Sequence, residues 1–483
     1  MSSDSIVERL YRAEEIRGTW QLPDAHDTSL PGMLSLDRNG QMKLTVDRQV
    51  SFIEGMQSVL SFERKSIPII LGVLEGSFCT LQGLTLIETT SFGSLLTEVF
   101  FVSAAIFGVH IDSFTEFKVR NITVSLPILM DWSKTSWCSD LNSHPKGLTL
   151  QPFGSRELPL GKAGNITGEI CVRGGFSFDV IPSRSLSMQQ GSFLTISFSE
   201  HVSLEDARKT LPLIGEFLSL MTLSAIQIPF FSCTSEEAKD MLPTGDGQEK
   251  PYYRPMMVWY YGMTEGAPYS GLSCDDMLLT YVDLKEANLV DALVRILAQP
   301  EEYDLLLPLL VPETGSFHSY SKWRFLDAAQ SLEYLHRRTS SNDVLSPEEF
   351  LVKRSRILAA VAEEDRSWLT ERLQRSNEPS LLYRISSIID TNAELLQTTV
   401  DQQSSFVKSV RDTRNVLIHL DSRRRNDAVN GLELINATDK LEALARISFL
   451  REIGFDEQGL EKLFSTTERP YVKHVRELFR SQN

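Results

Sequence analysis

The dominant hydrophobic period of this chain changes near residue 285, and this change most limits the folds open to it. From Gly18 to about Ser199, apolar residues recur at period two, as in half-buried β-strands. From about Lys285 to the end they recur at helical spacing. Strands followed by helices are typical of an α+β chain built from separate domains.

An antiparallel β-rich domain is predicted for residues 1–310, and a sandwich is one form open to it. Residues 41–46 alternate cleanly between apolar and polar side chains, and the Asn39-Gly40 pair before them is a strong hairpin signal. One helix is expected over residues 203–223, because Ser203 can cap its N-terminus. Residues 225–281 are predicted to return to strands that complete the same domain.

An all-α helical bundle is predicted for residues 311–483, because helix breakers are scarce there. Residues 308–317 hold two prolines and a glycine and are the expected linker. The expected helices, the first of which precedes the linker, span residues 285–298, 319–339, 346–373, 378–396, 399–420, 426–453 and 471–480.

Composition and targeting signals favour a cytoplasmic protein. The longest apolar run, Val99–Val109, is about half of what crosses a bilayer, so no membrane partner is expected. The N-terminus lacks the basic and then apolar pattern of a secretory signal. The five cysteines are scattered without C-x-x-C spacing, which argues against a disulfide framework and a zinc site. No metal or other cofactor is indicated.

The net charge is distributed unevenly. The whole chain carries −16, residues 311–483 carry about −1, and about −15 is left for residues 1–310. A polyanion is therefore expected to contact the C-terminal region, at a local basic patch.

One segment of the C-terminal region, residues 399–420, carries a distinctive set of polar side chains. Asn415 and His419 are four residues apart and share one helix face, and Arg414 lies on the flank, from which its long side chain can swing toward them. On a helical wheel of about 100° per residue, the stripe roughly opposite forms the core side, with Phe406, Val410, Thr413, Leu417 and Leu420. The cations on or just after the polar face are candidate RNA contacts, since they could track phosphates: Lys408, Arg411, Arg423, Arg424 and Arg425.

The sequence "TRNVLIH", residues 413–419, resembles the Arg-x4-6-His motif of the HEPN ribonucleases, and it ends the fourth helix of the expected bundle. The earlier helix over residues 323–338 resembles the first helix of such domains, with Glu333 and Arg337 matching a supporting Glu-x3-Arg pair. Residues 18–46 resemble the opening of the β-rich N-terminal domain of ApeA-type proteins, which are bacterial anti-phage HEPN nucleases. The matching residues are Trp20, Leu22, Pro23, Gly32, Leu34 and Leu44.

This resemblance implies a metal-independent endoribonuclease that acts in anti-phage defence by abortive infection. The ribose 2′-hydroxyl would be the nucleophile, and His419 would transfer a proton near neutral pH. Arg414 would stabilise the charge that develops on the phosphorus, and Asn415 would hold the imidazole or a phosphate oxygen. One motif supplies one histidine, so a homodimer or higher oligomer through the HEPN bundle is expected.

The resemblance also indicates the partners. RNA with an accessible loop is the expected substrate, tRNA above all, because unstacked bases are easiest to reach. A phage component is the expected activator, the acidic β-rich domain is the expected sensor or restraint, and the bacterial cytoplasm is the expected location.

Two other functions are compatible with the sequence. The bundle could be a catalytically inactive HEPN dimerisation or antitoxin module beside a ligand-binding β domain, although the intact Arg414, Asn415 and His419 argue against it. A hydrolase on the β-rich half is disfavoured, because Gly271–Asp275 lacks the second glycine of a nucleophile elbow.

Overall fold

The protein forms two compact units in the structure, which is a computed structural model. The β unit contains residues Met1–Leu218, Ile226–Ser273 and Val290–Pro300, and the helical unit contains Ser219–Ala225, Cys274–Leu289 and Glu301–Asn483. The structure describes residues 3–24, 29–49, 66–137, 142–144, 147–149, 154–178, 186–243, 248–263, 271–311, 322–396, 400–419, 426–466 and 468–479.

The predicted α+β class, with an antiparallel β region before a helical region, is confirmed. The helical unit includes segments that precede residue 311. Whether residue 310 is the boundary between independently folding domains stays a prediction.

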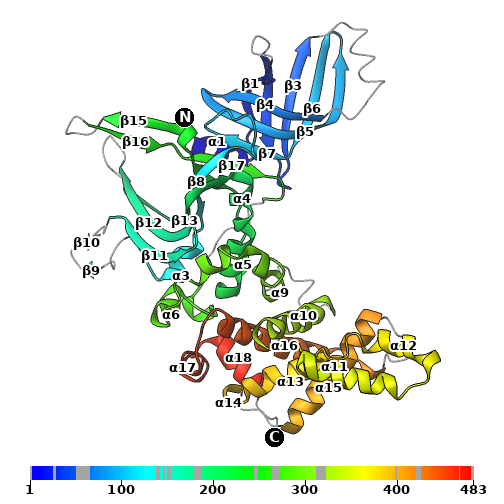
Figure 1. Ribbon diagram of the computed structural model, residues 1–483. Coiled ribbons are helices and arrows are strands. Elements are labelled where there is room, and N and C mark those ends of the chain that lie inside the picture. The colour runs from blue at the N-terminus through cyan, green and yellow to red at the C-terminus, as the bar shows by residue number, and fades with distance from the viewer. Residues whose placement is uncertain are drawn as a thin grey trace. The chain divides into compact units, whose positions relative to one another are not determined.

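The β unit is built on one 13-stranded antiparallel sheet, in the order β11-β12-β13-β8-β14-β17-β7-β5-β4-β1-β2-β3-β6 (Figure 1). β5 pairs with β6 as well as with β4, so the strands β5-β4-β1-β2-β3-β6 close into a ring. The described strands are therefore not the two stacked sheets of a sandwich. The strands of the sheet are β1 (Ile16–Gln21), β2 (Leu30–Leu36), β3 (Met42–Gln49), β4 (Ser66–Leu74), β5 (Ser77–Phe92), β6 (Leu95–Val102), β7 (Ala104–Phe107), β8 (Lys118–Ser125), β11 (Arg156–Ala163), β12 (Ile166–Phe178), β13 (Leu186–Ser203), β14 (Phe231–Thr234) and β17 (Met256–Tyr260).

Two short hairpins and four α-helices complete the described residues of this part of the chain. The prediction that residues 225–281 return to strands is confirmed by β14, β17 and the second hairpin. The hairpins are β9 (Asn142–His144) with β10 (Gly147–Thr149), and β15 (Lys239–Pro243) with β16 (Glu249–Tyr253). The helices are α1 (Ser3–Tyr11), α3 (Ile128–Ser133), α4 (Leu204–Arg208) and α5 (Thr210–Thr222).

The hairpin between β2 and β3 turns at the predicted Asn39-Gly40 pair. Gly40 has φ +71°, a left-handed conformation that glycine adopts without strain. The Asp37 carboxylate accepts hydrogen bonds from the backbone N–H groups of Asn39 (2.9 Å) and Gln41 (3.0 Å). The local sequence therefore fixes this turn through both its glycine and its acidic side chain.

The expected helix over 203–223 is correct at its start and wrong in its continuity. The Ser203 side chain accepts a hydrogen bond from the Asp206 N–H at 3.1 Å, as the cap prediction requires. The chain then forms α4 and α5 in place of one helix. At the break the Thr210 hydroxyl donates to the Ala207 carbonyl at 2.7 Å, a local bond of the kind that competes with helical backbone bonds.

The helical unit has α10 at its centre, packed against α13, α15 and α16. Every helix within the described ranges is too short or too polar to cross a bilayer. The helices from residue 281 onward are α6 (Tyr281–Glu286), α7 (Ala292–Leu297, in the β unit), α8 (Pro300–Tyr303), α9 (Leu307–Leu310), α10 (Lys322–Thr339), α11 (Pro347–Ala359), α12 (Glu363–Leu373), α13 (Leu381–Thr391), α14 (Ala393–Leu396), α15 (Val400–His419), α16 (Leu432–Glu452), α17 (Glu457–Glu461) and α18 (Pro470–Phe479).

Three of the expected helices are each divided in the structure. The segment 285–298 contains the end of α6 and all of α7, because Asn288 takes a left-handed φ of +57° between them. The segment 346–373 forms α11 and α12, since Ala362 is extended, and 378–396 forms α13 and α14. The predicted linker 308–317 begins inside α9, and the rest of it lies outside the described residues.

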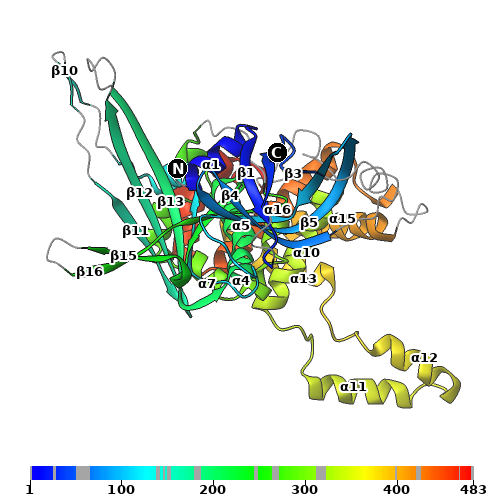
Figure 2. The same cartoon turned by 90° about the horizontal axis from the view of Figure 1, so that it is seen from above.

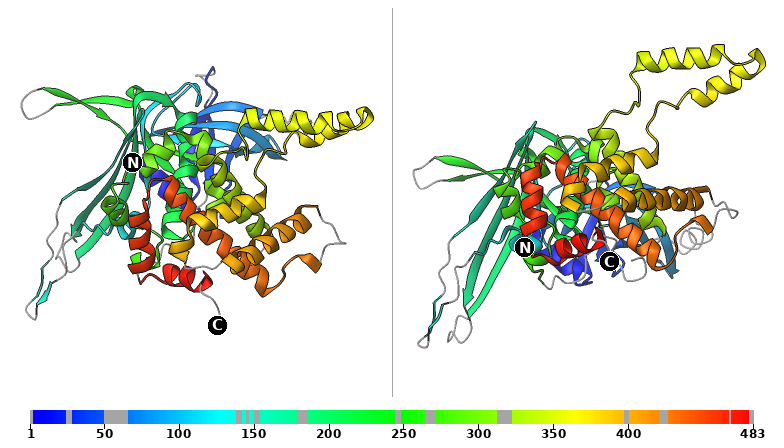
Figure 3. Two further views of the ribbon diagram at one scale, coloured as in Figure 1. Left: turned by 60° about the horizontal axis from the view of Figure 1, so that its bottom comes forward. Right: turned by 90° about the horizontal axis from the view of Figure 1, so that it is seen from below.

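α11 and α12 form a hairpin that projects from the other helices of its unit (Figure 2, Figure 3). Its main contacts are within itself, and neither helix has a buried residue. Its two ends are joined by Asn377. The side-chain amide of Asn377 donates to Asp343 Oδ1 (3.0 Å) and to the Leu345 carbonyl (2.9 Å), and its oxygen accepts from the Leu345 N–H (3.0 Å). The hairpin is therefore anchored at its base, between α10 and α13.

Trp20, only 1% exposed, packs among buried strand residues of the closed ring. Its indole needs the space that two glycines leave on neighbouring strands. A Cβ atom on Gly32 would lie 2.9 Å from Trp20 Cδ1, and one on Gly72 would lie closer to the six-membered ring. Leu34 and Leu44, paired across β2 and β3, are fully buried in the same core.

We expect Gly72→Ala to destabilise the protein by about 1–3 kcal/mol, because the added methyl group overpacks against Trp20. Gly175→Ala is the matched control, since a Cβ atom there meets no atom within 4 Å, and it should change stability by no more than about 0.5 kcal/mol. Urea unfolding followed by tryptophan fluorescence measures both. Equal stability of the two variants would contradict this account of the core.

Candidate functional site

Two arginines near the ends of α10 fix this helix on α16. Arg324 forms a bidentate ion pair with Glu442, in which Nη2 lies 2.6 Å from Oε2. Arg338 donates from both Nε (2.9 Å) and Nη2 (2.7 Å) to one oxygen of Glu452. All four side chains are less than a quarter exposed, so these pairs are less screened by solvent than surface ion pairs. The orientation of α10, and of the face it turns away from α16, is thereby set.

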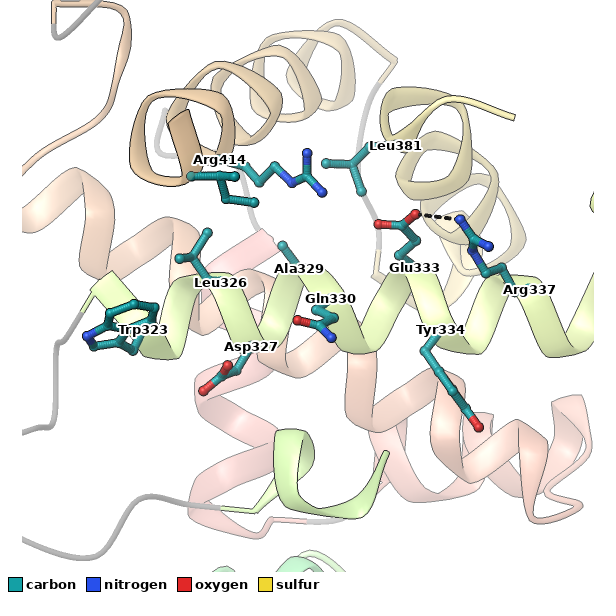
Figure 4. Close-up of a pocket in the computed structure, with 11 residues that line it drawn as sticks. Trp323, Leu326, Asp327, Ala329, Gln330, Glu333, Tyr334, Arg337, Leu381 and Arg414 are labelled. Atoms are coloured by element: carbon teal, nitrogen blue, oxygen red, sulfur yellow. Dashed lines mark hydrogen bonds and ion pairs between the residues drawn. The ribbon is translucent and has the colours of Figure 1, made fainter. Parts of the chain in front are cut away.

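A pocket of about 710 Å³ lies along that face of α10 (Figure 4). α13 contributes Leu381 to its lining, and α15 contributes Arg414 and Ile418. α10 contributes residues from four successive turns, including Trp323, Asp327, Gln330, Glu333 and Arg337. The pocket is therefore walled by three helices whose mutual packing is fixed within one unit.

Three of the predicted site residues meet in this pocket. Glu333 and Arg337 form the expected pair, with Nη2 3.0 Å from Oε1, and Arg337 also lies 3.7 Å from Glu378. Arg414 extends from α15 across the pocket toward Leu381 and Glu333 (Figure 4). Among the described residues no ion pair engages Arg414, so its guanidinium is available to an anionic ligand.

Asn415 and His419 do not line the pocket, although they lie on the same helix as Arg414. His419 is exposed, as the helical wheel predicts, and Asn415 is half-buried. Five residues along an α-helix correspond to about 140° of rotation and about 7.5 Å of rise. Arg414 and His419 of one chain therefore face different directions, and the expected swing of Arg414 toward His419 is not what the structure shows.

Two of the predicted RNA-binding cations, Lys408 and Arg411, lie three residues apart on α15 and are therefore neighbours on its surface. Lys408 is exposed and lies outside the pocket lining. Arg411 donates to the adjacent Asp412 from Nε (2.9 Å) and Nη2 (2.7 Å), so part of its charge is neutralised. The remaining candidates lie outside the described residues: Arg423, Arg424 and Arg425.

The core side of α15 is rotated slightly from the predicted stripe. Val410 and Thr413 are buried as expected, and the Thr413 hydroxyl accepts a hydrogen bond from the Val429 N–H at 3.0 Å. Val407, which the wheel left out, is buried too, whereas Phe406 is half-buried. Leu417 is also half-buried, and Leu420 lies outside the described residues. The stripe shifts because α15 packs against both α10 and α13.

A buried hydrogen-bond network joins α10 to α13 beside the pocket. Arg384 and His336 are 1% and 2% exposed, and the Arg384 guanidinium donates to His336 Nδ1 at 3.1 Å. The same guanidinium donates to the Pro379 carbonyl (3.1 Å) and to Asn342 Oδ1 (3.2 Å). Burial, and then the nearby Arg384 charge, lower the pKa of His336 below its ordinary 6.5. A neutral imidazole is required here, since only an unprotonated Nδ1 can accept from a guanidinium.

Sequence reasoning missed the end of the pocket formed by Trp323, Asp327 and Gln330. These residues follow one another at helical spacings of four and three, so they lie on one face of α10. Glu333 and Arg337 continue the same face. A wheel of α10 alone would have shown this second, mixed face opposite its buried stripe.

Comparisons with known proteins assign families to both regions. A family model described as ApeA N-terminal domain 1 matches residues 15–289, and one described as Apea-like HEPN matches residues 326–459. No curated protein matches. One solved structure that matches is described as MrkH, a c-di-GMP-dependent transcription regulatory factor. The match covers 45% of this chain and 91% of the MrkH chain, at 10% sequence identity. Its TM-score of 0.14 is too low to carry an argument.

We expect the stability of the protein to fall between pH 7.5 and pH 5.5 more steeply in the wild type than in His336→Asn. The unfolded chain takes up a proton on this histidine near pH 6.5, whereas folded His336 does so only at lower pH. The stability that depends on neutral His336 is therefore complete above about pH 6.5 and is lost as the pH falls toward the folded pKa. Asparagine can still accept from Arg384 but does not titrate.

Thermal unfolding at the two pH values measures this difference. The control is the same substitution at an exposed position, His201→Asn, which should keep the wild-type difference in stability between the two pH values. Identical pH dependence of wild type and His336→Asn would show that His336 is not titrating in this way.

Proposed function

This chain belongs to the ApeA family of HEPN-type anti-phage defence proteins, since the ApeA N-terminal family model matches more than half of it, and we propose that it is an RNA-cleaving endonuclease. The proposal rests on the position of α15, the helix that contains Arg414 and His419. Arg414 lines a pocket together with the Glu333–Arg337 pair, inside the region matched by the HEPN model, and His419 is exposed five residues further along the same helix.

The chemistry that these residues support is transfer of a phosphoryl group within RNA. An unprotonated imidazole takes the proton of the ribose 2′-hydroxyl, whose oxygen then bonds to the adjacent phosphorus. The phosphorus–O5′ bond breaks, and a protonated imidazole gives a proton to the departing oxygen, which leaves a 2′,3′-cyclic phosphate. Arg414 stabilises the extra negative charge on the phosphoryl oxygens. Proton transfer and charge stabilisation are both supplied by side chains, so the proposed reaction needs no metal.

We propose that the active unit is a pair of chains. One motif contributes one histidine, whereas the reaction uses a base and an acid. Within one chain, Arg414 points into the pocket and His419 is exposed on another side of the helix. An isologous pairing of two α15 helices would bring two copies of each group to one cleft, because each contact across a two-fold axis occurs twice.

The substrate proposed is RNA with an accessible unpaired loop, of which tRNA is the first candidate. Residues 1–310, with about −15 of net charge, would disfavour RNA binding at long range and could restrain the site until a phage component binds. Asn415, Lys408 and Arg411 are proposed to contact the imidazole or the RNA backbone.

We expect Arg414→Ala and His419→Ala each to lower the rate of RNA cleavage about 100-fold or more, since each removes a group that acts in the transition state. The assay is digestion of total tRNA by the full chain in the presence of EDTA. His474→Ala is the matched control, being an exposed histidine of the same unit outside the motif, and it should cleave at the wild-type rate. Full activity of His419→Ala, or a strict need for Mg²⁺, would exclude the proposed mechanism.

We expect cleavage per chain to fall as the protein is diluted below the dissociation constant of the dimer. Sedimentation velocity and cleavage rates, measured over one concentration series, should change at the same concentration. The physical reason is that the motif of a separated chain supplies one imidazole, His419, where the reaction needs two. A monomer that cleaves at the full rate would rule out the paired site.

A further inference from the structure

The tryptophan at one end of the pocket is unusually exposed. Trp323 opens α10 and lines the pocket, yet 71% of it remains accessible to solvent (Figure 4). A large aromatic side chain left in water does not gain the stabilisation that burial of its apolar surface would give. Such a side chain at the mouth of a pocket is suited to cover a flat apolar ligand.

The polar residues beside Trp323 can bind the edge of such a ligand. Asp327 and Gln330 follow it on the same face of α10 and line the same pocket. A carboxylate accepts hydrogen bonds, and an amide both donates and accepts, so together they can pair with the mixed edge of a nucleobase. Gln330 is exposed, so its amide is accessible to a ligand.

The charges in the pocket fit one base and one phosphate better than a row of phosphates. The lining holds two guanidinium groups and two carboxylates, and Glu333 already neutralises part of Arg337. Arg414 alone has no ion pair among the described residues. Gln330 lies seven residues after Trp323, which corresponds to about 10 Å along α10, and Arg337 lies fourteen residues after it, which corresponds to about 21 Å. The groove is therefore long enough for a base at one end and a phosphate near its middle.

We propose that Trp323 is a base-stacking residue, and that the pocket takes an unpaired nucleobase of the RNA while Arg414 holds a neighbouring phosphate. This inference rests on the proposed function and specifies its substrate class. A base inside a duplex is covered on both faces by its neighbours and has no free face for an indole, so the pocket selects unpaired RNA. Trp323 is thus a specificity-determining residue and takes no part in proton transfer.

The test measures RNA affinity in full-length protein that carries His419→Ala, so that the RNA stays intact. The probe is a short unstructured RNA with a fluorescent label, compared with a duplex of the same length. Stacking of one base contributes about 1–3 kcal/mol, so Trp323→Ala should weaken binding of the unstructured RNA roughly 5- to 150-fold. Trp323→Phe should retain most of the affinity, because its ring can also stack. Binding of the duplex should be weak and unchanged.

Trp368 supplies the matched control. It is a tryptophan of the same unit, 60% exposed on α12, and it does not line the pocket. Trp368→Ala should leave RNA affinity unchanged. Binding of unstructured RNA should also quench tryptophan fluorescence in the parent protein and in Trp368→Ala, and much less in Trp323→Ala.

Several results would overturn the inference. Affinity within twofold of the parent in Trp323→Ala, or equal losses in Trp323→Ala and Trp368→Ala, would exclude stacking on Trp323. A change in the sedimentation mass of Trp323→Ala without a change in RNA affinity would show a contact between proteins.

The two proposals can fail separately. If the variants show the expected affinities but the wild type cleaves no RNA, stacking stands and the ribonuclease proposal falls. If the wild type cleaves RNA and Trp323→Ala leaves KM unchanged, stacking falls and the ribonuclease proposal stands. Where both hold, Trp323→Ala should raise KM more than it lowers kcat.

Discussion

The ion pairs that hold α10 on α16 are the constraint on which the candidate site depends. α10 supplies one whole wall of the pocket, so its rotation decides which side chains enter. Arg324 and Arg338 fix that rotation near both ends, each through a largely buried glutamate. Glu442 also pairs with Arg446, and Arg338 also pairs with Glu302, so each contact belongs to a small ion-pair network. The same pairs therefore serve the fold and the geometry of the site.

The second wall is fixed in a different way. α13 is joined to α10 through Arg384, whose acceptors are an imidazole, a backbone carbonyl and a side-chain amide. Asn377 continues the junction to the base of the α11–α12 hairpin, so three elements meet beside the pocket.

The sequence predicted the fold class and several local details, and these share a physical reason. The Asn39-Gly40 turn and the Ser203 cap depend on interactions within a few residues, which a single sequence displays directly. The closed ring depends on β5 pairing with β4 on one side and with β6 on the other, and no local pattern specifies such pairing. The division of long periodic segments into α11 and α12, or α13 and α14, was missed because hydrophobic period alone does not mark short breaks.

The candidate site was predictable only in part for a related reason. Resemblance pointed to the motif residues and to the Glu333–Arg337 pair, and the structure brings that pair beside Arg414. It did not point to Trp323, because a single sequence does not show that this exposed tryptophan lies next to a pocket. Helical geometry alone predicts that Arg414 and His419 lie on different sides of α15. The structure adds that the Arg414 side faces the pocket.

The charge distribution of the protein explains why short-range contacts would have to dominate recognition of RNA. Residues 311–483 are almost neutral and the rest of the chain is acidic, so net charge does not favour the binding of a polyanion. Within the pocket, positive and negative groups balance, and attraction between one guanidinium and one phosphate is partly screened by solvent. Stacking and hydrogen bonding do not depend on net charge. A ligand that offers an accessible aromatic face next to a phosphate can therefore bind here, whereas a uniform phosphate backbone has little to gain.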